Sequence, residues 1–183
     1  MQKGVFLDRD GIVNVDRGYV HLKEDFVFCE GIFDLCRMLE DHGFKIFMIT
    51  NQSGIARGYF TLNEFKALND WMLGIFLEHG IHISKVYYCP HHPTEGKSEF
   101  RIDCRCRKPA PGMILQAGEE FNLNLKESIL IGDGERDIEA GIRAGVGQVY
   151  WVSDNVSTGV NFSPTAIFKD LAGLMAHLRG VLT

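Results

Sequence analysis

The sequence has no long apolar run and no excess of positive charge. No segment approaches the roughly 20 consecutive apolar residues of a membrane-spanning helix, and the formal net charge of the 183 residues is −5. This charge excludes a broad surface for nucleic acid or for an anionic membrane. Internal repeats and low-complexity tracts are also missing. Any anionic ligand therefore has to be met by positive charge that is gathered locally.

The chain also lacks the features of a signal peptide, because the apolar run in the N-terminal MQKGVFLDRDG is only a few residues long. Its five cysteines are therefore not expected to form a disulfide framework. Hydrophobic residues make up 45% of the chain and charged residues 23%, which is ordinary for a globular protein. We expect one cytoplasmic domain over residues 1–183 that acts as a monomer.

Short apolar runs alternate with longer helical patterns, which predicts a parallel α/β sheet. The predicted strands are residues 4–7, 44–50, 85–89, 128–133 and 148–152. The predicted helices are residues 31–42, 61–80, 111–122, 135–145 and 168–179. Thr61 and Glu64 have the spacing of a capping box at the start of the second helix. We expect a doubly wound, Rossmann-like sheet with two long irregular loops, at 11–30 and 89–109.

Polar side chains follow several of these strands. The residues concerned are Asp8, Asp10, Thr50, Asn51, Lys108, Asp133 and Asp137. Because ligands bind beyond the carboxyl ends of the strands in open parallel sheets, we expect these side chains to share one edge of the fold.

The set suits phosphoryl transfer. Asp8 can attack phosphorus and form an acyl phosphate, and Asp10 can protonate the leaving oxygen and then activate water. Asp133 can complete an oxygen-rich Mg²⁺ site. Thr50 and Lys108 can hold the phosphoryl oxygens as charge redistributes in the transition state. Since Asp8 alone would repel a phosphate dianion, the metal and the lysine make the attack possible.

An isolated D-x-D-G sequence is more often a polar turn at a strand end, and a calcium loop is a second alternative. A calcium loop requires acids or amides at its first, third and fifth positions before a glycine. Gly11 directly follows Asp10, and an apolar strand precedes Asp8, so the calcium interpretation fails. The other polar segments at the same edge favour the catalytic interpretation over the polar turn.

Four motifs resemble those of the haloacid dehalogenase-like phosphatases, in the same order and over nearly the whole chain. They are FLDRDG (6–11), MITNQSG (48–54), CRKPAPGM (106–113) and LIGDGERDI (130–138). The resemblance implies Asp8 as nucleophile, Asp10 as acid/base, and Thr50 and Lys108 as phosphoryl stabilisers. It also implies Mg²⁺ held by Asp8, the Asp10 carbonyl and Asp133. The gap from Asp8 to Thr50 is too short for a large cap domain, so we expect an open site.

More narrowly, four segments are similar to the branch of this family that dephosphorylates heptose bisphosphates in nucleotide-activated heptose synthesis. They are DRGYVH (16–21), TNQSGIARGYFT (50–61), YYCPHHP (87–93) and CRCRKPAPGM (104–113). The similarity implies substrate contacts from Asp16, Arg17, Gly18, Tyr19, Thr50, Asn51, Gln52, Ser53 and Arg107. Gly134 departs from the pattern of that branch, which often has lysine at this position, and Ile12 stands where the first motif commonly has threonine.

Two alternatives and one choice of substrate stay open at this point. Histidinol-phosphate phosphatases share the CRCRKP type of loop, and they are the alternative within the family. A phosphoacceptor signalling domain, which also uses an acidic pocket, Mg²⁺ and a lysine, is the alternative of another class. The sequence does not distinguish the α from the β anomer of the heptose.

Cysteine and histidine gather at the two ends of the loop 89–106. The four candidate zinc ligands are Cys89, His91, Cys104 and Cys106. Thiolates and an imidazole suit a closed, tetrahedral structural zinc site, and His92 is the alternative to His91. The loop has no apolar periodicity, so metal ligation is expected to order it. Ligation would then also fix Arg107 and Lys108, which follow the last ligand directly.

Three other charged or titratable residues have two interpretations each. Arg101 and Arg105 either lie on a solvated face or receive a second phosphate of the substrate. His21, in the first long loop, is either a sugar contact or a plain surface histidine.

Overall fold

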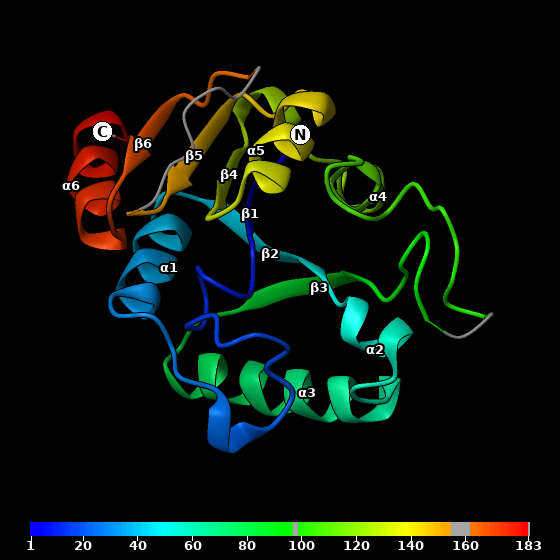
Figure 1. Cartoon of the computed structure of the whole chain (residues 1–183). Coiled ribbons are helices and arrows are strands. Elements are labelled where there is room, and N and C mark those ends of the chain that lie inside the picture. The colour runs from blue at the N-terminus through cyan, green and yellow to red at the C-terminus, as the bar shows by residue number, and fades with distance from the viewer. Residues whose placement is uncertain (97–98, 155–161, 183) are drawn as a thin grey trace.

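The computed structural model describes residues 1–96, 99–154 and 162–182 (Figure 1). Its centre is one sheet of six parallel strands, in the order β3-β2-β1-β4-β5-β6. The strands are β1 (Lys3–Leu7), β2 (Phe44–Asn51), β3 (Ile83–Cys89), β4 (Ile129–Gly132), β5 (Gln148–Val152) and β6 (Ala166–Phe168). The helices are α1 (Ile32–Asp41), α2 (Ser53–Arg57), α3 (Leu62–Glu78), α4 (Gly112–Glu120), α5 (Glu135–Ala144) and α6 (Leu171–Val181).

Helices cover both faces of the sheet, so the central strands are buried on both sides. Val5 and Leu7 of β1 pack into a core shared with α1, α3 and α6. Phe6, between them, points to the opposite face and packs against α4 and α5. The predicted fold class, a doubly wound α/β sheet, is confirmed, and no cap domain is inserted in the part of the chain that is described. Within the predicted loop 89–106, residues 97 and 98 lie outside the described residues.

The start of α3 follows the predicted capping box. The Thr61 hydroxyl accepts a hydrogen bond from the Glu64 backbone N–H at 3.2 Å, and the Glu64 carboxylate accepts one from the Thr61 N–H at 2.7 Å. These bonds satisfy two donors that the first turn of a helix otherwise leaves free. The Thr61 backbone N–H and the Thr61 hydroxyl, which donates at 2.8 Å, both donate to the Glu64 carboxylate and lower the pKa of Glu64.

The structure corrects one predicted element and adds two others. The closing helix begins at Leu171 rather than at residue 168, because Phe168 belongs to β6 and Asp170 caps the helix by accepting from Gly173 N at 2.9 Å. Helix α2 was not expected, since five residues are too few for a periodic pattern. The short strand β6 lacks a pattern for the same reason.

The order of the strands reverses between β1 and β4, at the centre of the sheet. After β1 the chain moves to β2 and β3 on one side, and it then returns past β1 to β4, β5 and β6 (Figure 1). The loops that follow β1 and β4 therefore diverge there, which opens space for a ligand. Among the described helices, none is long and apolar enough to cross a membrane.

Candidate active site

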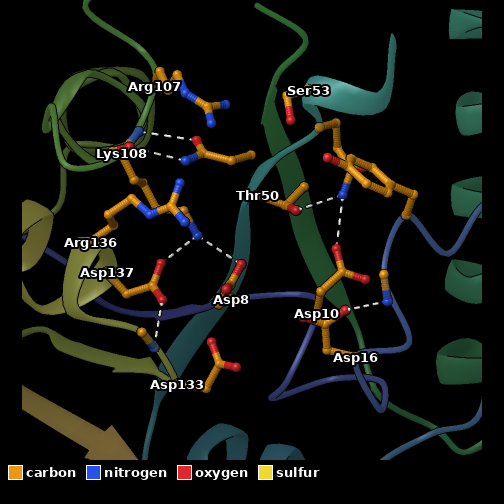
Figure 2. A pocket seen from close by; sticks show the side chains of 15 residues that line it. Asp8, Asp10, Asp16, Thr50, Ser53, Arg107, Lys108, Asp133, Arg136 and Asp137 are labelled. Atoms are coloured by element: carbon orange, nitrogen blue, oxygen red, sulfur yellow. Dashed lines mark hydrogen bonds and ion pairs between the residues drawn. The ribbon is translucent and has the colours of Figure 1, made fainter. Parts of the chain in front are cut away.

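A cavity of about 360 Å³ lies at this reversal point, beyond the carboxyl ends of β1, β2 and β4 (Figure 2). It brings together nearly all the residues that the sequence singled out for catalysis, magnesium and substrate. They are Asp8, Asp10, Asp16, Gly18, Tyr19, Thr50, Asn51, Gln52, Ser53, Arg107, Lys108 and Asp133. Arg17 belonged to the same predicted set, but it is exposed and does not line this cavity.

Lys108 is the buried cation at the base of the cavity, with only 3% of its surface exposed. Its ammonium contacts Asp8 Oδ1 at 2.7 Å and Asp137 Oδ1 at 2.5 Å, and it donates a hydrogen bond to the Ile49 carbonyl at 2.9 Å. Burial lowers the pKa of Lys108, but the two carboxylates outweigh that effect and raise it above its usual value. The lysine therefore stays charged beside Asp8.

Carboxylates outnumber cations at this point. Asp8, Asp133 and Asp137 each offer an oxygen within 4.8 Å of the others. Burial, followed by the charge of Asp137, raises the pKa of Asp8 well above its usual value and that of Asp133 to about 7. Because Lys108 neutralises only one of the three charges, the set fits a divalent cation bound through oxygen ligands.

Gly11 is required by the close approach of Asp133. Its φ is +98°, which favours glycine, and a Cβ built at this position would lie 1.9 Å from Asp133 Oδ2. Any side chain at residue 11 would therefore displace the Asp133 carboxylate from the cavity.

The Asp10 carboxylate is held by three donors. Arg9 Nη2 donates to its two oxygens at 2.9 and 3.0 Å, Asn14 Nδ2 donates at 3.1 Å and Gln52 Nε2 at 3.0 Å. Arg9 is completely buried, although its neighbours in the sequence face the cavity. The arginine between the two acids thus orients Asp10, a role that the sequence pattern did not reveal.

Side-chain amides also fix Thr50 and Lys108. Gln52 Nε2 donates to Thr50 Oγ1 at 2.8 Å. The Asn51 side chain exchanges two hydrogen bonds of 3.0 Å with the backbone N–H and carbonyl of Lys108. These two hydrogen bonds connect the end of β2 with the segment before α4. The Thr50 hydroxyl and the Lys108 ammonium therefore face the same cavity, although they come from separate parts of the chain.

A second cluster lies where β3 runs into the long loop. Cys89, His91, Cys104 and Cys106 each offer one ligand atom within 4.8 Å of the others. The Sγ–Sγ distances are 3.5 Å between Cys89 and Cys104 and 3.3 Å between Cys104 and Cys106. A zinc–sulfur bond of about 2.3 Å in a tetrahedron places sulfurs roughly 3.8 Å apart, so the cluster fits a zinc ion far better than a disulfide.

The two neighbouring histidines have different surroundings. His91 Nδ1 lies 3.6 Å from Cys106 Sγ and 3.8 Å from Cys89 Sγ. His92 faces away from the thiols: its Nδ1 accepts from Glu95 N at 3.0 Å, and its Nε2 lies 3.3 Å from Arg57 Nη2. His91 is therefore the histidine positioned to complete a four-ligand site.

Arg136 and Asp137 are lining residues for which the sequence did not assign a role in the site. Asp137, besides its contact with Lys108, accepts a hydrogen bond from Gly134 N at 3.1 Å. Both residues are the last two of the motif GDGERD, in the first turn of α5, and this motif was the one available signal. Arg101 and Arg105 are exposed and do not line the cavity, whereas the His21 ring stacks on Phe60 at a centroid distance of 5.0 Å.

In the absence of divalent cations, the free energy of unfolding is expected to fall as the pH rises from about 4 to about 7. An acid whose pKa is raised on folding holds a proton in the folded state that it loses in the unfolded state, so stability decreases across that interval. For Asp133, whose pKa rises from 3.8 to about 7, the loss is on the order of 4 kcal/mol.

Urea unfolding in a chelating buffer at about pH 5 and about pH 8 measures this loss. Adding Mg²⁺ at the higher pH should restore the stability, because a bound cation neutralises the carboxylates. Asp133→Asn should narrow the difference between the two curves without the metal, and the difference that remains is expected from Asp8, whose pKa is also raised. A stability that rises between the two pH values would contradict the expectation.

The fold and the site together define a hydrolase of the haloacid dehalogenase class, and residues 105–174 match the family model described as HAD-hydrolase-like. The resemblance of the four motifs to this class is therefore confirmed. Relatives place the chain more narrowly, since it belongs to the family of D-glycero-D-manno-heptose-1,7-bisphosphate 7-phosphatases.

Three relatives carry this assignment. The D-glycero-alpha-D-manno-heptose-1,7-bisphosphate 7-phosphatase of Burkholderia mallei is 42% identical over 97% of this chain and 94% of its own length. The D-glycero-beta-D-manno-heptose-1,7-bisphosphate 7-phosphatase of Yersinia pestis is 47% identical over 78% of this chain and 76% of its own. The crystal structure of D,D-heptose 1,7-bisphosphate phosphatase from B. bronchiseptica, complexed with magnesium and phosphate, matches with a TM-score of 0.85 and 29% identity, over 98% of this chain and 99% of that one.

Proposed function

We propose that this protein removes the 7-phosphate of D-glycero-D-manno-heptose 1,7-bisphosphate through an aspartyl-phosphate intermediate, in the synthesis of nucleotide-activated heptose. The observation that carries the proposal is the buried contact of Asp8 with Lys108 at the end of β1, with Asp10 two residues further on. It supports the reaction for which the relatives of the chain are named.

Asp8 acts as the nucleophile and Asp10 as the proton carrier. An Asp8 oxygen attacks the phosphorus, the bond from phosphorus to the sugar oxygen breaks, and protonated Asp10 gives its proton to that oxygen. Asp10 then takes a proton from a water molecule, which attacks the acyl phosphate and releases inorganic phosphate together with free Asp8. The three donors around Asp10 keep its carboxylate in one place through both half-reactions.

Lys108 and Thr50 hold the phosphoryl oxygens as charge moves onto the leaving group. Asp8, the Asp10 carbonyl and Asp133 would hold Mg²⁺, which would supply positive charge to offset that of the reacting phosphate. Asp137 keeps Lys108 in position through its ion pair at 2.5 Å.

The cysteine cluster would bind a structural zinc ion through Cys89, His91, Cys104 and Cys106. Arg107 follows the last of these ligands, and its Nη1 donates to the His91 carbonyl at 3.2 Å. Zinc binding would thus hold Arg107 and Lys108 against the cavity, although the four ligands themselves do not line it.

The substrate is a phosphorylated sugar bound in the open cavity between the loop 16–19 and the segment 50–53. The net charge of −5 supports a small-molecule substrate rather than nucleic acid. We also propose that the protein acts as a cytoplasmic monomer.

Phosphate release with Mg²⁺ from both anomers of the heptose bisphosphate, compared with histidinol phosphate, tests the proposal. We expect kcat/KM for one heptose anomer to exceed that for histidinol phosphate by roughly 100-fold, because a site that hydrogen-bonds the hydroxyls of its substrate rejects an analogue that lacks them. Preference for histidinol phosphate would assign the protein to histidine biosynthesis. Stable phosphorylation of Asp8 without turnover would instead identify a phosphoacceptor domain.

A further inference from the structure

The loop that brings Asp16, Gly18 and Tyr19 to the cavity has an unusual backbone conformation. Figure 2 shows Asp16 across the cavity from Lys108. Gly18 has a φ of +76°, and Tyr19, directly after it, has a φ of +54°. Glycine adopts this left-handed region readily, whereas a bulky side chain adopts it only where its surroundings hold it there. The conformation that keeps Tyr19 at the cavity therefore depends on support from outside the loop.

Aromatic rings that follow α2 provide part of this support. The rings of Tyr19 and Tyr59 meet edge to face, with their centroids 4.7 Å apart. The His21 ring stacks on Phe60, and its Nδ1 lies 2.8 Å from the Tyr19 carbonyl oxygen. Because 45% of Tyr19 and 55% of Tyr59 is exposed, burial alone does not fix this pair of rings.

Arg57, the last residue of α2, lies beside the two tyrosines. Its Nη1 pairs with the Glu95 carboxylate, and its Nη2 lies 3.3 Å from His92 Nε2. Burial lowers the pKa of the guanidinium, but Tyr19, Glu95 and Tyr59 outweigh that effect and raise it above its usual value. The guanidinium is therefore placed between the aromatic pair and the start of the long loop.

The long loop also meets α2 through its backbone. Gly96 has a φ of +100°, and a Cβ built at this position would lie 2.1 Å from the Ala56 carbonyl oxygen. The loop thus packs directly on the residue before Arg57. At its other end, α2 begins directly after Gln52, whose amide donates to Asp10 at 3.0 Å. Arg57 is therefore attached to the catalytic edge through α2 and to the long loop through its side chain.

We infer that Arg57 is a positioning residue that holds the loop 16–19 at the cavity through Tyr59 and Tyr19. The inference rests on the proposed function, in which this loop contacts the sugar. Arg57 itself does not line the cavity. A partly exposed ion pair contributes little to stability on its own, but an ordered loop lowers the entropy that substrate binding would otherwise lose. The loss of Arg57 should therefore weaken sugar binding and leave the chemical step unchanged.

Amide hydrogen exchange, measured by mass spectrometry without substrate, tests the positioning directly. In Arg57→Gln, the backbone amides of residues 16–21 should exchange roughly 10-fold faster than in the unchanged protein, because the loop opens more often. Tyr59→Ala, which removes the ring that contacts Tyr19, should have the same effect. The double variant should add little to either change, since both residues act through one contact.

Kinetics separate positioning from catalysis. For the heptose bisphosphate, we expect KM of Arg57→Gln to rise roughly 10-fold while kcat changes by less than about twofold. With acetyl phosphate, whose small leaving group does not extend to the loop, kcat/KM should stay within about twofold. Arg57→Lys should be intermediate, because it keeps the charge that pairs with Glu95 but not the planar fork.

Arg37→Gln is the matched control. Arg37 also joins two segments, since it pairs with Asp34 and donates to the His79 carbonyl at 3.3 Å, and it does not line the cavity. It should change neither the exchange of residues 16–21 nor the kinetics.

The inference is overturned if Arg57→Gln leaves the exchange of residues 16–21 unchanged, or if it lowers kcat for both substrates equally. If the unchanged protein does not hydrolyse the heptose bisphosphate, the proposed function fails. The exchange experiment needs no substrate, so it still decides in that case whether Arg57 positions the loop.

Discussion

Asp8→Asn is expected to abolish phosphate release, with kcat falling by roughly 10⁴-fold or more, because an amide cannot form the acyl phosphate. The variant should fold normally. Asparagine keeps the shape of the side chain, and burial together with Asp137 already disfavours the charged form of Asp8. Release of inorganic phosphate at saturating heptose bisphosphate measures the rate, and acid quenching with labelled substrate detects the covalent phosphoenzyme.

Asp10→Asn is the matched comparison, because it alters the neighbouring acid and leaves the nucleophile in place. With a sugar phosphate, kcat should fall by about 10²- to 10⁴-fold, since the leaving oxygen is no longer protonated. With p-nitrophenyl phosphate, whose leaving group needs no proton, the phosphoenzyme should form and then accumulate. Wild-type turnover by Asp8→Asn, or an acid-stable phosphoenzyme in that variant, would show that another residue is the nucleophile.

Cys104→Ser is expected to remove zinc and to lower kcat/KM together, by roughly 10- to 100-fold. The side chain lies between Cys89 and Cys106 in the cluster, at Sγ distances of 3.5 and 3.3 Å. Without the ion, the loop no longer fixes the positions of Arg107 and Lys108, which directly follow Cys106 in the chain. The loss of zinc is therefore expected to lower the activity by displacing these two residues from the cavity. Metal analysis of the purified protein gives the zinc content, and phosphate release gives the activity.

The adjacent histidines provide the control for this expectation. His91→Ala should reproduce the loss of zinc, because its Nδ1 faces two cysteine sulfurs. His92→Ala should keep the full zinc content, since its ring interacts with Arg57 and the Glu95 backbone instead. Full activity in a zinc-free Cys104→Ser protein would separate the cluster from catalysis.

The order of strands and helices follows from the sequence because its signals are local. Apolar runs such as GVFL and FKIFMIT indicate strands wherever they lie, and a capping box such as Thr61–Glu64 needs only neighbouring residues. The gathering of Asp8, Thr50, Lys108 and Asp133 could also be anticipated, since parallel strands have their carboxyl ends at one edge. Elements of three to five residues, β6 and α2, carry too little pattern to be anticipated in this way.

The sequence by itself therefore determined the class of fold and the edge of the sheet at which the polar residues meet. Only the tertiary structure decided the direction of individual side chains. It turns His91 toward the cysteines and His92 away from them, it pairs Asp137 with Lys108, and it places Arg136 on the cavity wall. The physical reason is the distance along the chain over which each feature is determined. Periodicity depends on neighbouring residues. The contact of Asp8 with Lys108, in contrast, joins side chains 100 residues apart and depends on how the whole sheet packs.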